Sequence, residues 1–502
     1  MFQIAANCSR TFAALIGLCA VLCSPLSGHA DVGELEKRLN ELLLQNSSDP
    51  NSTGRVTESG LSAKPLIEAY LAMSPPPVPV GADFNLTTIW PGMNGWEAVS
   101  NWAAANEKMA EVITEVQGRP LLGMRYGRSN VPAAWSQADI LIDVAPGGDL
   151  ALIAYPYLDA MDVIISYATA EFYRRLEAGE YTSAFEFGLA YLRILRQGCE
   201  QDMLDEKLWF MDTLSVAFST HRDAMYAYLD RIPSDVYKNL GTKEYPFLKA
   251  TDDQRLRRLE LPEGDRIHIE LLLESAFDSR GQADREKFAE IFGSLQARQK
   301  PFGRFGTKKQ WARLAEYHST LDLSKEKLED VYDDWWRRWR YRQFEGIMDL
   351  PNEFSKLNEI RYAAIRLAVT DLEEIFFARE RLVSDINGTI FSAGLCAFHQ
   401  QYQKWPRDLA PVAPAYAMKR FNFDPYNTEY GEMVYVLLNA RKPIETRFGQ
   451  LWAEGCLLYT LGRDNIDAGA RQVSDNGEIG SDLLLWPPTR QLAREQGKIQ
   501  LP

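Results

Sequence analysis

The sequence predicts a mainly α-helical protein that ends in a small α+β domain with an antiparallel sheet. Two observations support this fold class. From about residue 152 to residue 403, apolar side chains recur mostly at helical spacing, with short breaks between the helices. After the proline-containing stretch "KWPRDLAPVAP" the pattern changes to short apolar runs bounded by glycine and asparagine, which is typical of strands.

The first thirty residues have the features of an export signal. Arg10 is their only charged side chain, and an eleven-residue apolar run extends from Phe12 to Leu22. Gly28 and Ala30 are the small residues that precede a cleavage site. The apolar run is too short to cross a bilayer. We therefore expect residues 1–30 to be a signal peptide, and the mature chain to be periplasmic or extracellular without a transmembrane helix.

The charge balance excludes one class of partner. The chain has 69 acidic and 55 basic residues, which gives a net charge of −14. A nucleic-acid-binding protein needs a basic surface that displaces counterions from phosphates. We therefore expect no nucleic-acid partner. An acidic chain of this kind is compatible with divalent cations.

We expect residues 31–150 to contain helices joined by irregular linkers. The stretch "DVGELEKRLNELLLQ" has leucines at helical spacing, and Trp96–Val116 has a helical composition. Polar turn formers at Asn46–Gly54 and the prolines of Ser74–Gly81 interrupt the helices.

Residues 151–385 are expected to form a helical body. Within Tyr157–Gln197, two helices are separated at Ala178–Tyr181, where small and aromatic residues resemble a tetratricopeptide-like hairpin. No second copy follows at a fixed period, so we expect an isolated hairpin rather than a repeat array.

A further helix of the body is expected to start at Ser324, whose hydroxyl can accept a hydrogen bond from a free backbone N–H. Ion pairs one turn apart are expected for Asp333–Arg337 and Asp334–Arg338. A packed helix with a solvated charged face explains this pattern, and a surface that binds glycans or anions is the alternative. The expected apolar face consists of Leu328, Val331, Tyr332, Trp335 and Trp339.

Residues 386–502 are expected to form a C-terminal head, in which a helix is followed by a small sheet. The stretches "GEMVYVLLN" and "GQLWAEGCLLYTLG" have the composition of strands, and the second contains a possible break at Gly455. The stretch "DLLLW" is a short last strand.

Residues from about Thr389 to Trp486 resemble the globular head of the major pseudopilin of bacterial type II secretion. The resemblance implies an α+β fold for this part. The matching features, in chain order, are Tyr402 with Trp405 and Pro406, Asp424 and Pro425 with Tyr426, Gly431 and Tyr435, "LYTLGRD" at Leu458–Asp464, and "SDLLLW" at Ser481–Trp486.

The chain also departs from that family. A pseudopilin begins with a long apolar helix that polymerises, whereas here some 350 mature residues precede the head. The helix before the head is too polar to lie in a membrane, so we expect no pilus assembly. Its charged residues are Arg361, Arg366, Asp371, Glu373, Glu374, Arg379, Glu380 and Arg381. In architecture the whole chain is similar to large exported bacterial proteins that join a helical body to such a head.

The resemblance implies a calcium site in the loop "LGRDNIDAGARQVSDNGEIGSD". In the family this loop holds calcium, and the implied ligands are the carbonyl of Leu461 and the carboxylates of Asp464 and Asp482. Asp467 could add a further carboxylate. Calcium prefers six to eight hard oxygens, and the loop glycines allow carbonyls to turn inward. The loop lacks the EF-hand alternation, and a solvated acidic loop is the alternative.

Three cysteines remain after removal of the signal: Cys199, Cys396 and Cys456. They form no CxxC pair, which disfavours a zinc site. Export permits disulfides, so two possibilities stay open. Either Cys396 pairs with Cys456, or all three are buried, inert thiols.

No catalytic motif is present. The sequence contains no HExxH, GxSxG, Walker A or dinucleotide-binding pattern. The four histidines of the mature chain, His221, His268, His318 and His399, are expected to be structural. We therefore expect a non-enzymatic interaction or scaffold protein of the cell envelope with an unidentified partner. The alternative is a periplasmic hydrolase that uses carboxylates in a cleft of the helical body.

Overall fold

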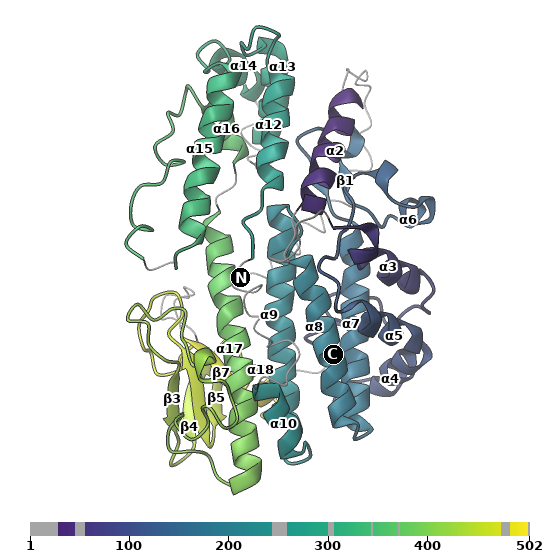
Figure 1. Cartoon of the computed structure of the whole chain (residues 1–502), viewed down its shortest axis with the longest axis vertical. Coiled ribbons are helices and arrows are strands. Elements are labelled where there is room, and N and C mark those ends of the chain that lie inside the picture. Colours follow the sequence, from purple (N-terminus) through teal and green to yellow (C-terminus); the bar gives the residue numbers. More distant parts are fainter. Residues whose placement is uncertain are drawn as a thin grey trace.

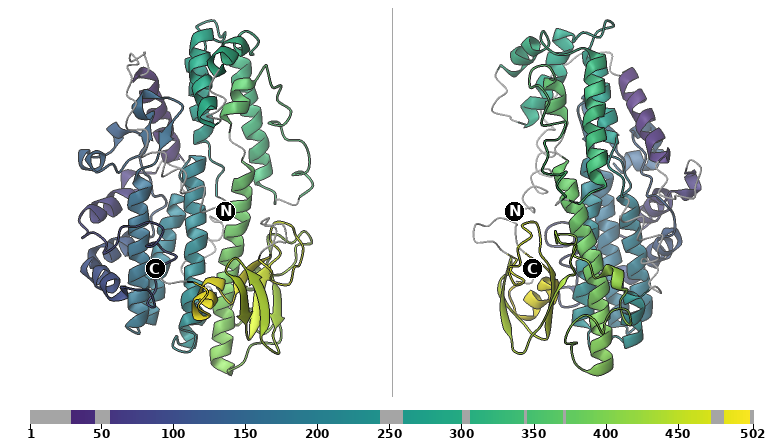
Figure 2. Two further views of the ribbon diagram at one scale, coloured as in Figure 1. Left: turned by 180° about the vertical axis from the view of Figure 1, so that it is seen from behind. Right: turned by 60° about the vertical axis from the view of Figure 1, so that its left-hand side comes forward.

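The computed structural model describes residues 29–45, 56–242, 259–299, 306–342, 345–369, 372–472 and 482–499. It confirms the predicted fold class, a mainly α-helical chain with small antiparallel sheets in its C-terminal part (Figure 1). Two long helices, α9 (Leu204–Ala227) and α17 (Glu373–Tyr402), pack side by side along the middle of the molecule. The C-terminal sheets lie beside α17, and earlier helices cover the other side of α9 (Figures 1 and 2).

The N-terminal part consists of short helices joined by irregular segments. The first of them, α2, buries Leu35, Leu39 and Leu43, which lie on one face because they are four residues apart. The elements are α2 (His29–Gln45), η2 (Glu58–Gly60), α3 (Ala63–Leu71), α4 (Trp96–Ala105), α5 (Glu107–Val116), η3 (Arg128–Asn130), α6 (Ala133–Gln137), β1 (Asp143–Val144), η4 (Pro146–Gly148) and β2 (Ile153–Ala154).

The helix expected over residues 96–116 is divided into α4 and α5 at Asn106. The side-chain amide of Asn106 donates to the Trp102 carbonyl at 2.8 Å, and its oxygen accepts from the Ser74 backbone N–H at 2.9 Å. These bonds hold Asn106 away from helical dihedrals, at φ −114° and ψ 33°. Asparagine commonly competes with helix continuation in this way.

The helical hairpin predicted around residues 178–181 is confirmed. α7 (Tyr157–Glu177) and α8 (Tyr181–Gly198) are joined by a short turn in which Gly179 has a φ of +78°. Glycine adopts this left-handed conformation without steric cost. Both helices of the hairpin contribute to the main hydrophobic core, and α8 packs against α9.

The upper part of the molecule in Figure 1 contains a second group of helices. Of these, α12 packs against α2 and α15, and α13 packs against α14. Their bounds, together with the α10 that follows α9, are α10 (Ser234–Gly241), α12 (Gly264–Ala276), α13 (Arg285–Gln299), α14 (Thr307–Leu314), α15 (Leu321–Trp339) and α16 (Ala363–Ala368).

The helix α15 confirms the predicted apolar face, since all five of its expected residues are buried. Asp334 and Arg338 form the expected ion pair at 3.0 Å. The predicted start was wrong, because α15 begins at Leu321 and the Ser324 hydroxyl donates to the Thr320 carbonyl at 2.8 Å. The Leu321 N–H is paired with the Gly281 carbonyl, a contact between distant segments that local sequence does not reveal.

The helix α17 is continuous through residue 385, where the expected body and head meet. Its N-terminal half carries charged side chains that face inward. Arg379 donates to the Tyr341 carbonyl and to the Glu380 carboxylate, both at 2.8 Å. The helix packs against both α9 and α10 of the body and against β6 and β7 of the head. One helix therefore contributes to the core of both parts.

The head contains two small antiparallel sheets. The first has the strand order β3-β6-β7, and the second is the β4–β5 hairpin. The elements are η7 (Lys419–Phe421), β3 (Val434–Leu437), β4 (Lys442–Thr446), β5 (Gly449–Ala453), β6 (Cys456–Thr460), β7 (Leu483–Trp486) and α18 (Thr489–Glu495).

The break expected at Gly455 is confirmed and separates β5 from β6. Gly455 has a φ of +79°, and a Cβ there would lie 2.3 Å from Nε1 of Trp405. A side chain would therefore be strained by both conformation and space. The sequence did not predict β4, where Pro443 weakens the strand signal.

The three mature cysteines are free and buried. The Cys396–Cys456 disulfide is therefore not formed in this structure. The two thiols are still neighbours, because burial and then the charge of a Cys456 thiolate raise the pKa of Cys396 well above its usual value. Within the described ranges, no helix has the length and apolarity that a membrane span requires.

Candidate functional site

The structure places the predicted calcium ligands at one end of the three-stranded sheet. Leu461 follows β6 directly, Asp464 and Asp467 lie in the turns after it, and Asp482 precedes β7. Because β6 and β7 are paired, the end of one strand and the start of the other are adjacent. Strand pairing therefore brings together carboxylates that are 18 residues apart in the chain.

The carboxylate of Asp482 is the best organised of the set. It accepts hydrogen bonds from the backbone N–H groups of Ala470 at 2.7 Å and Ala468 at 3.3 Å. Burial raises the pKa of Asp482 to about 6, these two bonds lower it, and the charges of Asp467 and Asp464 raise it further. The three carboxylates are thus near enough to repel one another, and a bound cation would relieve that repulsion.

The two other aspartates are partly occupied by local hydrogen bonds. Oδ1 of Asp467 accepts from the Tyr459 hydroxyl and from the Gly469 N–H, both at 2.9 Å. Oδ1 of Asp464 accepts from the Ile466 N–H at 3.1 Å. For each side chain these bonds involve one of the two oxygens, so the second oxygen of each is left for another ligand.

Leu461 is fixed by a residue that the calcium hypothesis did not include. Its N–H donates to Oδ2 of Asp424 at 2.9 Å, and Oδ1 of Asp424 accepts from the Tyr426 N–H at 2.8 Å. Asp424 is fully buried, and burial raises its pKa to about 6. Asp424 belongs to the Asp–Pro–Tyr motif of the pseudopilin resemblance, and that motif was the signal that could have identified its anchoring role.

The described residues supply oxygen chemistry suited to calcium, but not a complete shell. Among them, no group of three or more His, Cys, Asp or Glu side chains is arranged to hold a metal ion. Gly462 and Gly469 both have a φ of +71°, as expected for loop glycines that orient carbonyls. Asp475, Glu478, Gly477 and Gly480 lie outside the described residues.

A second cluster of carboxylates lies in the helical body, at the corner between α8 and α9. Its centre is Glu206, which is fully buried. One Glu206 oxygen accepts from the Tyr126 hydroxyl at 3.1 Å, and the other accepts from the Tyr157 hydroxyl and from the Gln201 amide, the latter at 3.1 Å. Glu206 therefore connects the N-terminal segment, α7 and the α8–α9 corner.

The acids around this corner have raised pKa values. Burial raises the pKa of Glu206 to about 7, although its three hydrogen bonds and Lys207 act in the opposite direction. Burial raises the pKa of Asp202 to about 8 and that of Asp265 to about 7. Asp265 is also fixed in place, because it accepts from the Leu204 N–H at 2.7 Å at the start of α9.

Such acids are candidates for general acid catalysis. Glu206 is 0% exposed and Asp202 is 1% exposed, and both oxygens of Glu206 already accept hydrogen bonds from protein donors. A substrate could reach Glu206 only after these bonds are broken. The arrangement is therefore that of a buried structural tie. The sequence could not single out these acids among 69.

Three of the four histidines are enclosed by aromatic or backbone groups. His221 stacks on Phe172 with ring centroids 4.7 Å apart, and burial lowers its pKa to about 4. His318 lies between aromatic rings, and burial lowers its pKa to about 4 as well. Nε2 of His268 is 2.5 Å from the Leu150 carbonyl. The fourth, His399, lies against Trp405. These surroundings are those of structural side chains.

The head is joined to the body by buried ion pairs along α9. Arg222 donates to Asp385 of α17 at 2.5 Å and to the Thr389 hydroxyl at 2.7 Å. The next residue, Asp223, accepts from Arg490 of α18. Consecutive residues of one body helix therefore bind two different helices that carry the head.

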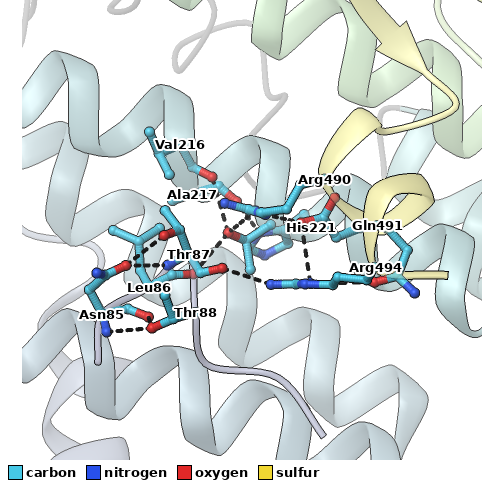
Figure 3. A network of polar contacts seen from close by, with 12 residues as sticks. Asn85, Leu86, Thr87, Thr88, Val216, Ala217, His221, Arg490, Gln491 and Arg494 are labelled. Atoms are coloured by element: carbon cyan, nitrogen blue, oxygen red, sulfur yellow. Dashed lines mark hydrogen bonds and ion pairs between the residues drawn. The ribbon is translucent and has the colours of Figure 1, made fainter. Parts of the chain in front are cut away.

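The second helix of the head, α18, also contacts the N-terminal part (Figure 3). Arg490 donates to the Thr220 hydroxyl at 2.8 Å, and Arg494 donates to the Thr87 carbonyl at 2.7 Å. The Arg494 guanidinium also lies 4.9 Å from the centre of the Trp90 ring. Segments some 400 residues apart in the chain are thereby held together.

Comparison of the chain with protein-family models, with curated proteins and with solved structures found no match.

Proposed function

We propose that this chain is an exported cell-envelope protein that acts as a scaffold or interaction module, and that its pseudopilin-like head binds calcium. The observation that carries the proposal is the rigid attachment of the head. Buried ion pairs join α9 to both α17 and α18, so the head presents its outer sheet in one orientation. A scaffold needs a fixed surface of this kind, because a partner then binds without an ordering cost.

The packing of α17 supports a scaffold rather than a pilin subunit. In a pilus the helix before the head would have to be free to pack against other copies. Here α17 is covered by α9 and α10 of the same chain, and its charged residues Arg379 and Asp385 are paired inside the molecule. Release of α17 would expose these paired charges, which is unfavourable.

We expect export and partner binding to be detectable in the native cells. The chain should be recovered from the envelope fraction with Asp31 as its first residue, and a chain that keeps residues 1–30 in the cytoplasm would contradict export. A photo-crosslinking side chain at Trp452, which is 44% exposed on β5, should give one discrete adduct. The control position is Tyr317, 66% exposed in the upper group of helices. Equal labelling at both positions would contradict a partner-binding head.

Calcium should raise the midpoint of thermal unfolding relative to a chelator. A ligand that binds only the folded state adds about 2.7 kcal/mol of stability at one hundred times its Kd. Asp464→Ala should remove most of this calcium-dependent increase, because Asp464 makes only a local bond to the Ile466 N–H besides its proposed role. Glu454→Ala, an exposed residue of the same head, is the control and should retain the full increase. The calcium proposal fails when the midpoint is the same with calcium and chelator, and Asp464→Ala melts like the parent.

A carboxylate hydrolase is the second candidate, and the raised pKa values of Asp202 and Glu206 are the observation in its favour. Both side chains are buried, however, and Glu206 is saturated with hydrogen bonds. Glycosidic or ester substrates turned over by the parent but not by Glu206→Gln would establish this candidate in place of the scaffold.

A further inference from the structure

Arginines outnumber aspartates where α9, α17, α18 and the β4–β5 turn meet. Arg381 lies 3.9 Å from Asp385, which is already paired with Arg222 at 2.5 Å. Asp223 likewise serves two arginines of α18. Two positive charges are therefore left without a carboxylate of their own among the described residues of this junction. The junction consists of Arg222, Arg381, Arg447, Arg490 and Arg494 with Asp212, Asp223 and Asp385.

Arg447 is the arginine with the least compensation. It lies in the turn between β4 and β5, and it makes no ion pair with any described residue. Its guanidinium is 4.8 Å from the centre of the Phe448 ring. Desolvation and then the nearby cations Arg490 and Arg381 lower the pKa of Arg447, while Asp223 partly offsets them. The fold therefore holds Arg447 close to two like charges.

The position of Arg447 is set by well-made local contacts. The Thr446 hydroxyl donates to the Gly449 carbonyl at 2.8 Å and accepts from the Phe448 N–H at 3.1 Å, which closes the turn. The hairpin is also bound to α18, since Gln496 exchanges two hydrogen bonds with the Trp452 backbone at 3.0 and 2.8 Å. Arg447 cannot move far from Arg490 without breaking this attachment.

The other two arginines complete the arrangement from different elements. Arg381 of α17 has a side chain that is 47% exposed, and its carboxylate contacts, 3.9 Å to Asp385 and 4.0 Å to Asp212, are longer than hydrogen bonds. Arg490 of α18 is 5% exposed and lies behind them. Arg381 and Arg447 thus offer guanidinium donors to solvent, and Arg490 adds a fixed positive charge.

We propose that Arg381 and Arg447, supported by Arg490, form a binding site for an oxyanion of the phosphate or sulfate class. Guanidinium groups bind such anions through pairs of N–H donors. Cations that converge from three elements suit an anion with several oxygens, whereas a carboxylate offers only two. The bound anion would neutralise the excess charge that the fold places here. The proposal requires neither calcium nor a protein partner.

Titration calorimetry of the full mature chain with inorganic phosphate tests the site, at constant ionic strength and with chloride as the reference anion. We expect saturable binding of one phosphate per chain and a raised thermal midpoint. Arg447→Gln should weaken phosphate binding by about tenfold or more, because a bidentate charged contact is lost. In the absence of phosphate this variant should be at least as stable as the parent, because it removes a like-charge contact.

The matched control is Arg441→Gln, which alters an exposed arginine at the other end of the same hairpin, paired with Glu454 at 2.6 Å. It should bind phosphate like the parent. The proposal is overturned when phosphate does not bind saturably, or when Arg447→Gln and Arg441→Gln bind it equally. Vesicles of phosphatidylglycerol and of phosphatidylcholine separate two sources of the anion. Co-sedimentation with the anionic vesicles alone, lost in Arg447→Gln, indicates a lipid headgroup, whereas phosphate binding without co-sedimentation indicates a soluble phosphate or sulfate ester.

Discussion

Asp223→Ala should destabilise the protein by about 3–5 kcal/mol, the usual cost of leaving one partner of a buried ion pair without its counter-charge. Asp223 is fully buried, and it accepts from Arg490, which is 5% exposed. Arg494 lies 3.7 Å from the same carboxylate oxygen. Loss of Asp223 would leave both arginines of α18 buried without a carboxylate and weaken the attachment of the head.

Urea unfolding at neutral pH measures this effect, and limited proteolysis shows whether α18 is released. Glu454→Ala is the matched control, because Arg441–Glu454 is an ion pair of the same head with both side chains more than 60% exposed. Exposed pairs contribute about 0–1 kcal/mol. Replacing Arg490 by methionine in the Asp223→Ala background should recover part of the loss, since the buried charge is then removed. A destabilisation by Asp223→Ala no larger than that of Glu454→Ala would contradict this account of the attachment.

The protein should be more stable near pH 5.5 than near pH 8. Burial raises the folded-state pKa of Glu206 and Asp265 to about 7 and that of Asp202 to about 8. Unfolded carboxyl groups titrate near their ordinary values of about 4. The folded state therefore binds more protons than the unfolded state between these limits. Stability is fully present below the unfolded pKa and falls as pH rises through the folded pKa.

Glu206→Gln isolates one proton of this effect. The amide keeps the size of the side chain but cannot ionise, so the slope of unfolding free energy against pH should decrease. One proton corresponds to a slope of about 1.4 kcal/mol per pH unit at most. Glu206→Ala should cost about 2–4 kcal/mol at every pH, because it leaves a cavity and removes the acceptor of the Tyr126 and Tyr157 hydroxyls.

Chemical unfolding at a series of pH values provides the measurement, with Glu454→Gln as an exposed control that should follow the parent. Stability that increases from pH 5.5 to pH 8 would show that Glu206 is ionised without penalty in the folded protein. The same outcome would remove the support that raised pKa values lend to a hydrolase.

Features that depend on neighbouring residues were predictable from the sequence. The spacing of Leu328, Val331, Tyr332, Trp335 and Trp339 placed them on one face of a helix, and all five are buried in α15. The break at Gly455 was also correct, because glycine allows the positive φ that the turn requires. The start of α15 was missed, since it depends on a bond between Leu321 and Gly281.

The residues that hold the molecule together were not predictable, because their partners are distant in the chain. Arg490 and Asp223 are 267 positions apart, and Glu206 and Tyr126 are 80 positions apart. Nothing in the local sequence distinguishes Asp223 or Glu206 from the other acidic residues. Their roles result from burial, which makes an unpaired charge costly and so makes each partner essential.

The acidic loop of the head combines both kinds of information. Its turn aspartates, its glycines and its position between two strands were evident from the order of residues. That Asp482 lies within the electric field of Asp464 and Asp467 follows from the antiparallel pairing of β6 with β7. Local periodicity thus specified the helices, the strands and the acidic loop. Packing between distant segments decided which charges are buried, which are paired, and which arginines remain open to an anion.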